Sequence, residues 1–191
     1  MPAGGIHLCV AKEVAIELDK FFSMNYMLGS VAPDSWRNSS STKVDTHFLT
    51  DFNCYDYDCF FNKYFSYMDN DFVFGYLVHL ITDMYWYGNN YVTSNYYENN
   101  CVDLKKICSN LIRIYDIPKL FLPVDLYNPI SELDSRGLIY TINYLNEVNY
   151  VLGDTKVFNI NDLIECIDDT SIYVVNEVNR LKNSKKYFLK K

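Results

Sequence analysis

Three histidines and two aspartates in this 191-residue chain are side chains that could bind a metal ion. His79 and Asp83 are four residues apart in the run Gly-Tyr-Leu-Val-His-Leu-Ile-Thr-Asp. His7 and His47 also lie beside apolar residues, and Asp34 lies in the turn-like segment Ala-Pro-Asp-Ser. Neutral imidazole nitrogens together with carboxylate oxygens are the ligand set of hydrolytic zinc sites. These five residues are therefore the candidate site.

The pair His79 and Asp83 carries the most weight because of its surroundings. Residues 72–87 are apolar nearly all round, which predicts a buried central helix. Residues four apart on a helix project from the same face. A buried histidine that bonds to an aspartate of its own helix is a common structural pair, and this interpretation stays open. None of the residues next to Asp83 could neutralise its charge, however, and a buried carboxylate needs a partner. A metal ion would be such a partner.

The other candidate residues each have an ordinary interpretation as well. His7 could be a histidine at a helix start, His47 a loop histidine, and Asp34 the cap of a turn. Asp51 follows His47 by four residues and forms a second His-x-x-x-Asp pair, but it falls in a polar stretch and we give it less weight. The prediction of a metal site therefore rests on the joint pattern.

The elements that must position these residues are predicted to be helices, because apolar residues recur at helical spacing. The expected helices span residues 6–22, 57–68, 72–87, 102–115, 137–149 and 161–181. Residues 89–100 are polar, and Pro118, Pro123 and Pro129 predict an irregular segment before the fifth helix. There is no internal repeat and no alternating strand pattern. We therefore expect one all-α domain over residues 1–191, with the motifs in 1–90 and a helical remainder in 91–191.

Residues 29–56 are expected to form one long loop, because they contain glycine, proline and a run of serines. Asp34 and His47 both lie in it. A loop of this length without regular structure is unusual in a compact domain unless it is functional. Metal ligands that hold the loop down would explain why it is tolerated.

Composition and charge exclude several classes of protein. The chain is 49% hydrophobic and 17% aromatic, which is typical of a globular protein. A formal net charge of −7 argues against a partner that is a nucleic-acid polymer, since such binding depends on Lys and Arg. A small anionic substrate remains compatible, because the local charge of a metal would outweigh the global field. No apolar run is long enough to predict a transmembrane segment.

The six cysteines include no Cys-x-x-Cys pair, which argues against a zinc ribbon or a thioredoxin-like site. The first residues, Met-Pro-Ala-Gly-Gly, lack the basic and apolar regions of a signal peptide. We therefore expect reduced thiols and a cytoplasmic location.

Four segments in the first half of the chain form an ordered set: His7, Leu28-Gly29-Ser30-Val31-Ala32-Pro33-Asp34, Thr46-His47-Phe48, and Phe74-Gly75-Tyr76-Leu77-Val78-His79-Leu80-Ile81-Thr82-Asp83. The set resembles the zinc-dependent phospholipase C family of bacteria, and most of all its small intracellular members. The resemblance covers residues 1–90. It implies a single-domain helical bundle of the phospholipase C and single-strand nuclease type.

The resemblance also implies a role for each candidate residue. His47, His79 and Asp83 resemble the ligands of one zinc, Asp83 resembles the carboxylate that bridges to a second, and His7 resembles a ligand of that second zinc. Asp34 resembles the residue that contacts the nucleophilic water and acts as general base. Secreted members carry a third zinc on a later histidine pair, and this chain has no histidine after His79. One or two divalent ions are therefore expected, and iron or manganese could replace zinc.

The leading hypothesis is a metal-dependent hydrolase of phosphoesters, with a small phosphoester or a phospholipid-like molecule as substrate. A hydrolase of the HD type is a second hypothesis, but such sites need an adjacent His-Asp dipeptide, which this chain lacks. From a different class, the chain could be a helical binding or adaptor module with structural histidines or a silent metal site. Residues 85–97 and 118–127 would then be candidate partner surfaces.

Overall fold

The computed structural model describes residues 3–36, 39–50, 54–89, 101–148 and 159–188. Every named element in these ranges is helical, and the only β feature among them is an isolated antiparallel bridge between Leu49 and Tyr55. The expected all-α class is therefore confirmed for the part that is described. Its elements are α1 (Gly4–Glu17), α2 (Met24–Val31), η1 (Ala32–Trp36), α3 (Lys43–Thr46), α4 (Tyr57–Lys63), η2 (Phe65–Tyr67), α5 (Asp71–Gly88), α7 (Cys101–Ile114), α8 (Ser135–Val148) and α9 (Ile160–Phe188).

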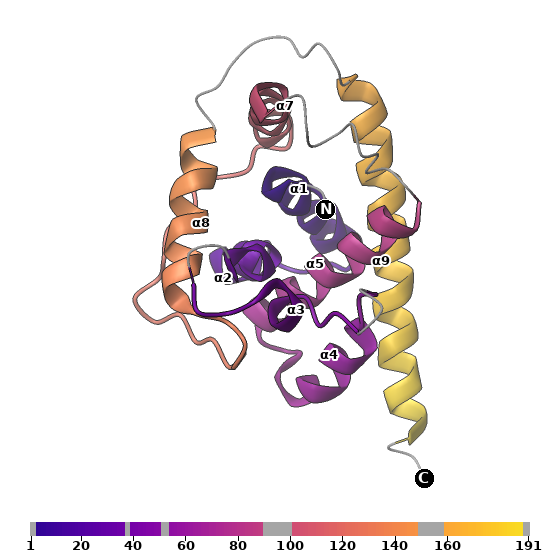
Figure 1. Cartoon of the computed structure of the whole chain (residues 1–191). Helices are drawn as coiled ribbons and strands as arrows, with labels where there is room; N and C mark the ends of the chain where they lie inside the picture. The colour runs from indigo at the N-terminus through magenta and orange to yellow at the C-terminus, as the bar shows by residue number, and fades with distance from the viewer. Residues whose placement is uncertain (1–2, 37–38, 51–53, 90–100, 149–158, 189–191) are drawn as a thin grey trace.

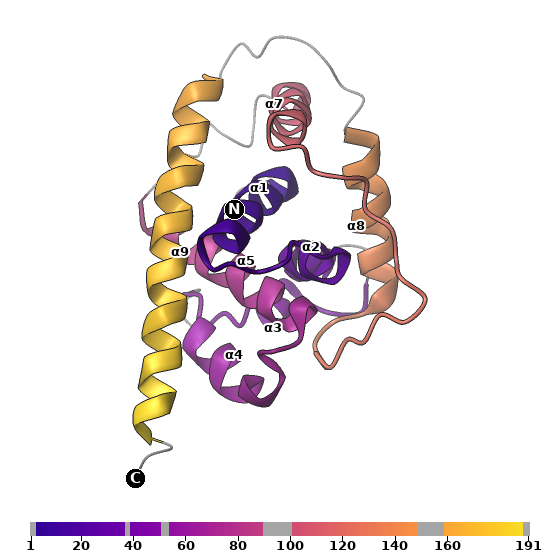
Figure 2. The same ribbon diagram turned by 180° about the vertical axis from the view of Figure 1, so that it is seen from behind.

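α1, α2 and α5 pack together at the centre of the protein, and the other helices lie around them (Figure 1). α8 and α9 lie on opposite sides of this centre, and α3 and α4 lie below it in both views (Figures 1 and 2). A single cluster of buried apolar side chains includes residues of α1, α2, α5, α7, α8 and α9. The assignment of all 191 residues to one domain stays a prediction.

The helix expected over residues 6–22 ends earlier than predicted, and a second helix, α2, which was not predicted, follows it. α1 ends at Glu17, and Asp19 adopts a left-handed conformation with φ 50°. The backbone N–H groups of Asp19 and Lys20 donate to carbonyls three and five residues earlier, as in a helix-ending Schellman motif. The Ser23 side chain then caps α2. Glycine is the usual residue at such a left-handed position, so an aspartate there left no recognisable stop signal in the sequence.

The expectation that residues 29–56 form one irregular loop is also wrong. α2 continues to Val31, η1 follows it directly, and α3 forms farther along. α3 begins with a capping box, in which the Thr42 side chain accepts from the Asp45 N–H and the Asp45 side chain accepts from the Thr42 N–H. Asp34 therefore lies in a 3-10 helix, and His47 is the residue that ends α3.

The remaining helices lie close to their expected positions. α5 and α7 match the predictions to within one residue, while α8 begins two residues early and the helix expected over 57–68 divides into α4 and η2. α9 continues to Phe188, seven residues beyond the expected end. Residues 115–134 form no helix or strand, as the prolines predicted. The polar stretch over 90–100 lies outside the described residues.

None of the described helices has the length and apolar character needed to cross a membrane. Cys9, Cys59, Cys108 and Cys166 are free thiols.

α2 and α5 pack with their backbones almost in contact. A Cβ atom added to Gly75 of α5 would lie 2.2 Å from the Tyr26 carbonyl oxygen and 2.9 Å from the Ser30 backbone nitrogen, both on α2. Only glycine permits so close an approach. The consequence is that the backbone of α2 lies within hydrogen-bonding distance of the side chain of His79, farther along α5.

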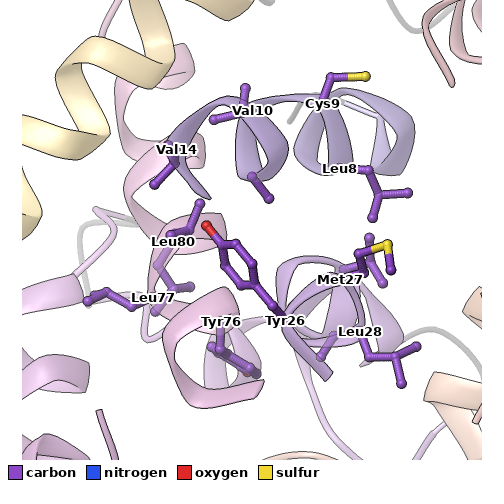
Figure 3. Packing of buried hydrophobic residues seen from close by; sticks show 14 of the residues in the cluster. Leu8, Cys9, Val10, Val14, Tyr26, Met27, Leu28, Tyr76, Leu77 and Leu80 are labelled. Carbon is purple, nitrogen blue, oxygen red and sulfur yellow. The ribbon is translucent and has the colours of Figure 1, made fainter. Parts of the chain in front are cut away.

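Tyr26 presents a buried polar atom to an apolar layer. Its side chain is fully buried, and its hydroxyl finds no hydrogen-bond partner in the part of the chain that is described. Figure 3 shows the hydroxyl oxygen pointing away from α2 toward Leu80. Burial raises the pKa of Tyr26, so the hydroxyl stays neutral. Leaving such a group without a partner costs about 1–3 kcal/mol.

We therefore expect Tyr26→Phe to stabilise the protein by about 1 kcal/mol, because the substitution removes only the unsatisfied hydroxyl. The midpoint of urea unfolding would measure the change. Tyr76→Phe is the matched control, since the buried Tyr76 hydroxyl donates to the Thr46 carbonyl and its loss should destabilise. A lower unfolding midpoint for Tyr26→Phe would contradict the prediction.

Candidate metal centre

All five candidate residues come together in the structure, from four different elements. His7 lies near the start of α1, Asp34 in η1, His47 at the end of α3, and His79 and Asp83 on α5. The side chains of the three histidines and Asp83 are completely buried, whereas that of Asp34 is 17% exposed. Solvent therefore reaches the cluster at Asp34.

Asp83 is at the centre of the cluster, because it faces all three histidines. Its Oδ1 lies 3.3 Å from His7 Nε2, and its Oδ2 lies 3.4 Å from His47 Nε2 and 3.5 Å from His79 Nε2. Asp34 Oδ1 lies 3.6 Å from His47 Nε2. None of these six atoms has a hydrogen-bond partner among the described residues. The cluster is therefore a set of polar atoms that converge without satisfying one another.

In His79 and His47, the ring nitrogen that does not face Asp83, Nδ1, makes a hydrogen bond that orients the ring. His79 Nδ1 lies 2.8 Å from the Ser30 carbonyl oxygen, which can only accept, so Nδ1 donates. His47 Nδ1 lies 3.0 Å from the Thr46 hydroxyl, which itself donates to the Thr42 carbonyl and so accepts from the ring. In the neutral form, both rings therefore keep the lone pair of Nε2 directed at Asp83. This is the second layer of contacts that metal-binding histidines usually have.

His7 differs from the other two histidines. Its ring stacks on that of His79, with ring centroids 3.7 Å apart and planes at 11°. Neither of its nitrogens has a hydrogen-bond partner in the described part of the chain. Burial, followed by the charge of His79, lowers the pKa of His7 to about 4. His7 is therefore neutral at pH 7 and has a free lone pair for a ligand bond.

The electrostatics of the cluster favour a bound cation. Burial alone would raise the pKa of Asp83, but the nearby His79 and His7 hold it well below its usual range. Burial likewise acts to raise the pKa of Asp34, yet its interactions with the histidines lower it. Both carboxylates are thus charged, and within the described ranges their ion pairs are all with histidines. A divalent cation would compensate two buried negative charges that imidazoles only partly neutralise.

The distances between the converging atoms also fit a metal ion. Nitrogen and oxygen ligands bind zinc at about 2.0–2.1 Å in a tetrahedron, so two ligands of one ion lie about 3.4 Å apart. The separations in the cluster are 3.3–3.6 Å. Two overlapping groups of possible ligands arise, His7 with His79 and Asp83, and Asp34 with His47 and His79. The residues present therefore fit one ion or two adjacent ions.

Helix α8 fixes the position of Asp34, and sequence reasoning missed this role. The Ser35 hydroxyl donates to the Thr141 hydroxyl at 3.2 Å, and both groups are buried. A Cβ atom on Gly137 would lie only 1.8 Å from the Ser35 carbonyl oxygen. α8 thus packs directly on the backbone of η1, next to Asp34. In the sequence, Gly137 within an amphipathic helix indicates that another backbone could come close at this point. It does not indicate that this backbone is that of η1.

Two further residues that orient the histidines, Ser30 and Thr46, were not predicted from the sequence. Ser30 acts through its carbonyl group, which every residue has, and Thr46 acts through a hydroxyl whose neighbour in the sequence is His47. Asp51, the alternative partner of His47, lies outside the described residues. The structure therefore gathers the set that was given more weight.

Metal binding is expected to strengthen as the pH rises above about 6.5. Burial lowers the pKa of His79, but the charge of Asp83 and the hydrogen bond to the Ser30 carbonyl raise it more, so the net shift is upward. Below that raised pKa, His79 carries a proton that a cation must displace; above it, the ring is neutral and the gain ends. Zinc affinity by competition titration between about pH 6 and about pH 9 checks this, with proton release measured by calorimetry. Affinity that does not change over this range would contradict it.

Comparison of the chain with protein-family models, with curated proteins and with solved structures finds no match in any of the three.

Proposed function

We propose that the protein is a metal-dependent hydrolase of phosphate esters, with a helical bundle of the phospholipase C and single-strand nuclease type. One or two divalent ions, zinc in the first instance, would be held by His7, His47, His79 and Asp83. One observation carries the proposal: buried histidine lone pairs converge at 3.3–3.5 Å around the Asp83 carboxylate, whose ion-pair partners among the described residues are all histidines. The resemblance of residues 1–90 to the zinc-dependent phospholipases agrees with it.

The residues of the cluster would have different roles in hydrolysis. A divalent ion held by these residues would supply Lewis acidity, which lowers the pKa of a water molecule and attracts an anionic phosphate. His79 belongs to both groups of ligands, and the two oxygens of Asp83 face different histidines. The Ser30 carbonyl and the Thr46 hydroxyl keep His79 and His47 in the ligand tautomer.

Asp34 is the proposed general base. Its interactions with the histidines lower its pKa, so it is ionised at neutral pH and able to accept a proton. It is also the one carboxylate of the cluster that solvent reaches, and its Oδ1 lacks a hydrogen-bond partner among the described residues. A water molecule that enters the cluster would therefore meet Asp34 first, and the carboxylate could orient it and take its proton.

The test combines metal analysis with activity. Protein purified without chelators should contain about one or two ions per chain and cleave bis(4-nitrophenyl) phosphate or 4-nitrophenyl phosphate, as expected for a site of this ligand set. A chelator should abolish the activity and added zinc should restore it. Less than one ion per chain, or a full metal content without turnover of either substrate, would overturn the proposal.

Asp34→Asn separates catalysis from metal binding. Because three histidines and Asp83 remain, we expect the variant to keep metal and to lose about 100-fold or more in kcat, the range typical of general-base removal. Asp169→Asn is the matched control, since Asp169 is exposed on α9, far from the cluster in the sequence. Equal activity of Asp34→Asn and Asp169→Asn would remove Asp34 from the mechanism.

A further inference from the structure

The face of α5 that carries His79 and Asp83 ends in an exposed aromatic ring. Tyr87 follows Asp83 by four residues, as Asp83 follows His79, so the three side chains lie along one stripe of the helix. Tyr87 is 60% exposed. One helical turn, about 6 Å along the axis, therefore leads from the buried cluster to an aromatic ring at the surface.

A second route, through a different element, leads from the cluster to the same ring. Tyr55 lies on the bridge that follows α3, and its ring meets that of His47 at 6.1 Å and 62°. On its other side it meets Tyr87 at 6.2 Å, again at 62°. Tyr55 itself is 8% exposed. His47, Tyr55 and Tyr87 thus form a series of edge-to-face rings that runs from the buried cluster to solvent.

The two aromatic residues before Tyr87 have structural roles. The Trp86 side chain is buried, and its Nε1 donates to the Thr170 hydroxyl at 2.9 Å. Tyr85 packs on Tyr173 of α9, with ring centroids 4.7 Å apart. Both residues fasten α5 to α9. A single exposed aromatic residue needs no explanation in itself, but the place of Tyr87 at the end of both routes makes it the aromatic rim of the cluster.

We propose that Tyr87, backed by Tyr55, binds a flat aromatic ring in the leaving group of the phosphate-ester substrate. This inference rests on the proposed function, because it assumes that the phosphate binds at the His/Asp cluster. Aromatic rings prefer edge-to-face or offset contacts with centroids 4.5–7 Å apart. A ring joined to phosphate through the ester oxygen spans a distance similar to one helical turn, so with the phosphate at the cluster this ring would lie beside Tyr87.

Phosphonates test the inference without turnover, because their P–C bond is not hydrolysed. Isothermal titration of the zinc-loaded protein would compare methylphosphonate, a choline-bearing phosphonate and benzylphosphonate, in which a methylene group takes the place of the ester oxygen. We expect the benzyl compound to bind about tenfold more tightly than the methyl compound, because one aromatic contact and the apolar area that it buries contribute a free energy of that size. Tyr87→Ala should bring this ratio close to one, while Tyr87→Phe should keep it.

Tyr127→Ala is the matched control, because Tyr127 is a tyrosine of similar exposure, 57%. Its ring contacts that of Tyr67, which precedes the first residue of α5, whereas Tyr87 lies near the last. A ratio that persists in Tyr87→Ala overturns the inference, and so does selective binding of the choline compound, which would indicate a cationic group instead. If all three phosphonates bind equally, the inference fails and the proposed function stands. If none binds and no phosphate ester is cleaved, both fail.

Discussion

Asp83→Asn is expected to lower the zinc affinity of the protein by more than about 100-fold, so that the purified variant contains less than about a tenth of an ion per chain. Changing a residue that only orients a ligand already costs about 10–100-fold in affinity, and Asp83 faces all three histidines directly. Asparagine keeps the shape but loses the negative charge and one of the two oxygens. Elemental analysis after dialysis, with zinc competition titration, measures the effect.

Asp169→Asn again serves as the control, and circular dichroism would verify that both variants are folded. If Asp83→Asn retained the metal content of the unmodified protein, the assignment of Asp83 as the central ligand would be wrong. Loss of metal together with loss of activity in this variant, beside loss of activity alone in Asp34→Asn, would separate the two aspartates as ligand and base.

Gly75→Ala is expected to destabilise the protein by about 3 kcal/mol or more, which is at the upper end of the cost of overpacking. The added Cβ would lie 2.2 Å from the Tyr26 carbonyl oxygen, a distance that no side-chain rotation can relieve because both atoms belong to packed helices. α2 and α5 must then move apart. Thermal or urea unfolding measures the loss.

Gly88→Ala is a control on the same helix. A Cβ atom there meets nothing within 4 Å, so the higher helix propensity of alanine should leave the stability unchanged or raise it by up to about 1 kcal/mol. Opposite signs for the two substitutions would show that close backbone contact, and not helix propensity, decides the role of Gly75. Similar unfolding midpoints for both variants would contradict this account.

The same substitution should also weaken metal binding. The Ser30 carbonyl that accepts from His79 Nδ1 lies on α2, next to the point where Gly75 touches it. Separation of the two helices would withdraw the acceptor that sets the tautomer of His79. Where enough folded Gly75→Ala protein is obtained, its zinc affinity should therefore be lower than that of Gly88→Ala.

The candidate residues could be recognised from the sequence alone, because the relevant properties depend on residues that are close together in the chain. A buried helix is visible as an unbroken apolar run, and a carboxylate in that run needs a partner wherever the helix packs. The spacing of His79 and Asp83 places both on one face of any helix. Because the chain contains three histidines, His7 and His47 were the remaining histidines that could join His79 as ligands.

The local errors also have physical causes. The break between α1 and α2 depends on the left-handed conformation of Asp19, for which the residue type is a weak signal. Of the short helices between residues 29 and 56, η1 is held by packing against α5 and α8, and α3 packs against η1. Elements of this size gain most of their stability from tertiary contacts.

Residue types and local periodicity thus define the all-α class, the buried helix α5 and the five polar residues of the cluster. They say nothing of which backbone lies against which, because that depends on contacts between residues far apart in the chain. The close approaches at Gly75 and Gly137 bring the Ser30 carbonyl to His79 and hold Asp34 beside His47. The convergence of lone pairs around Asp83, and the route of rings that ends at Tyr87, are consequences of that packing alone.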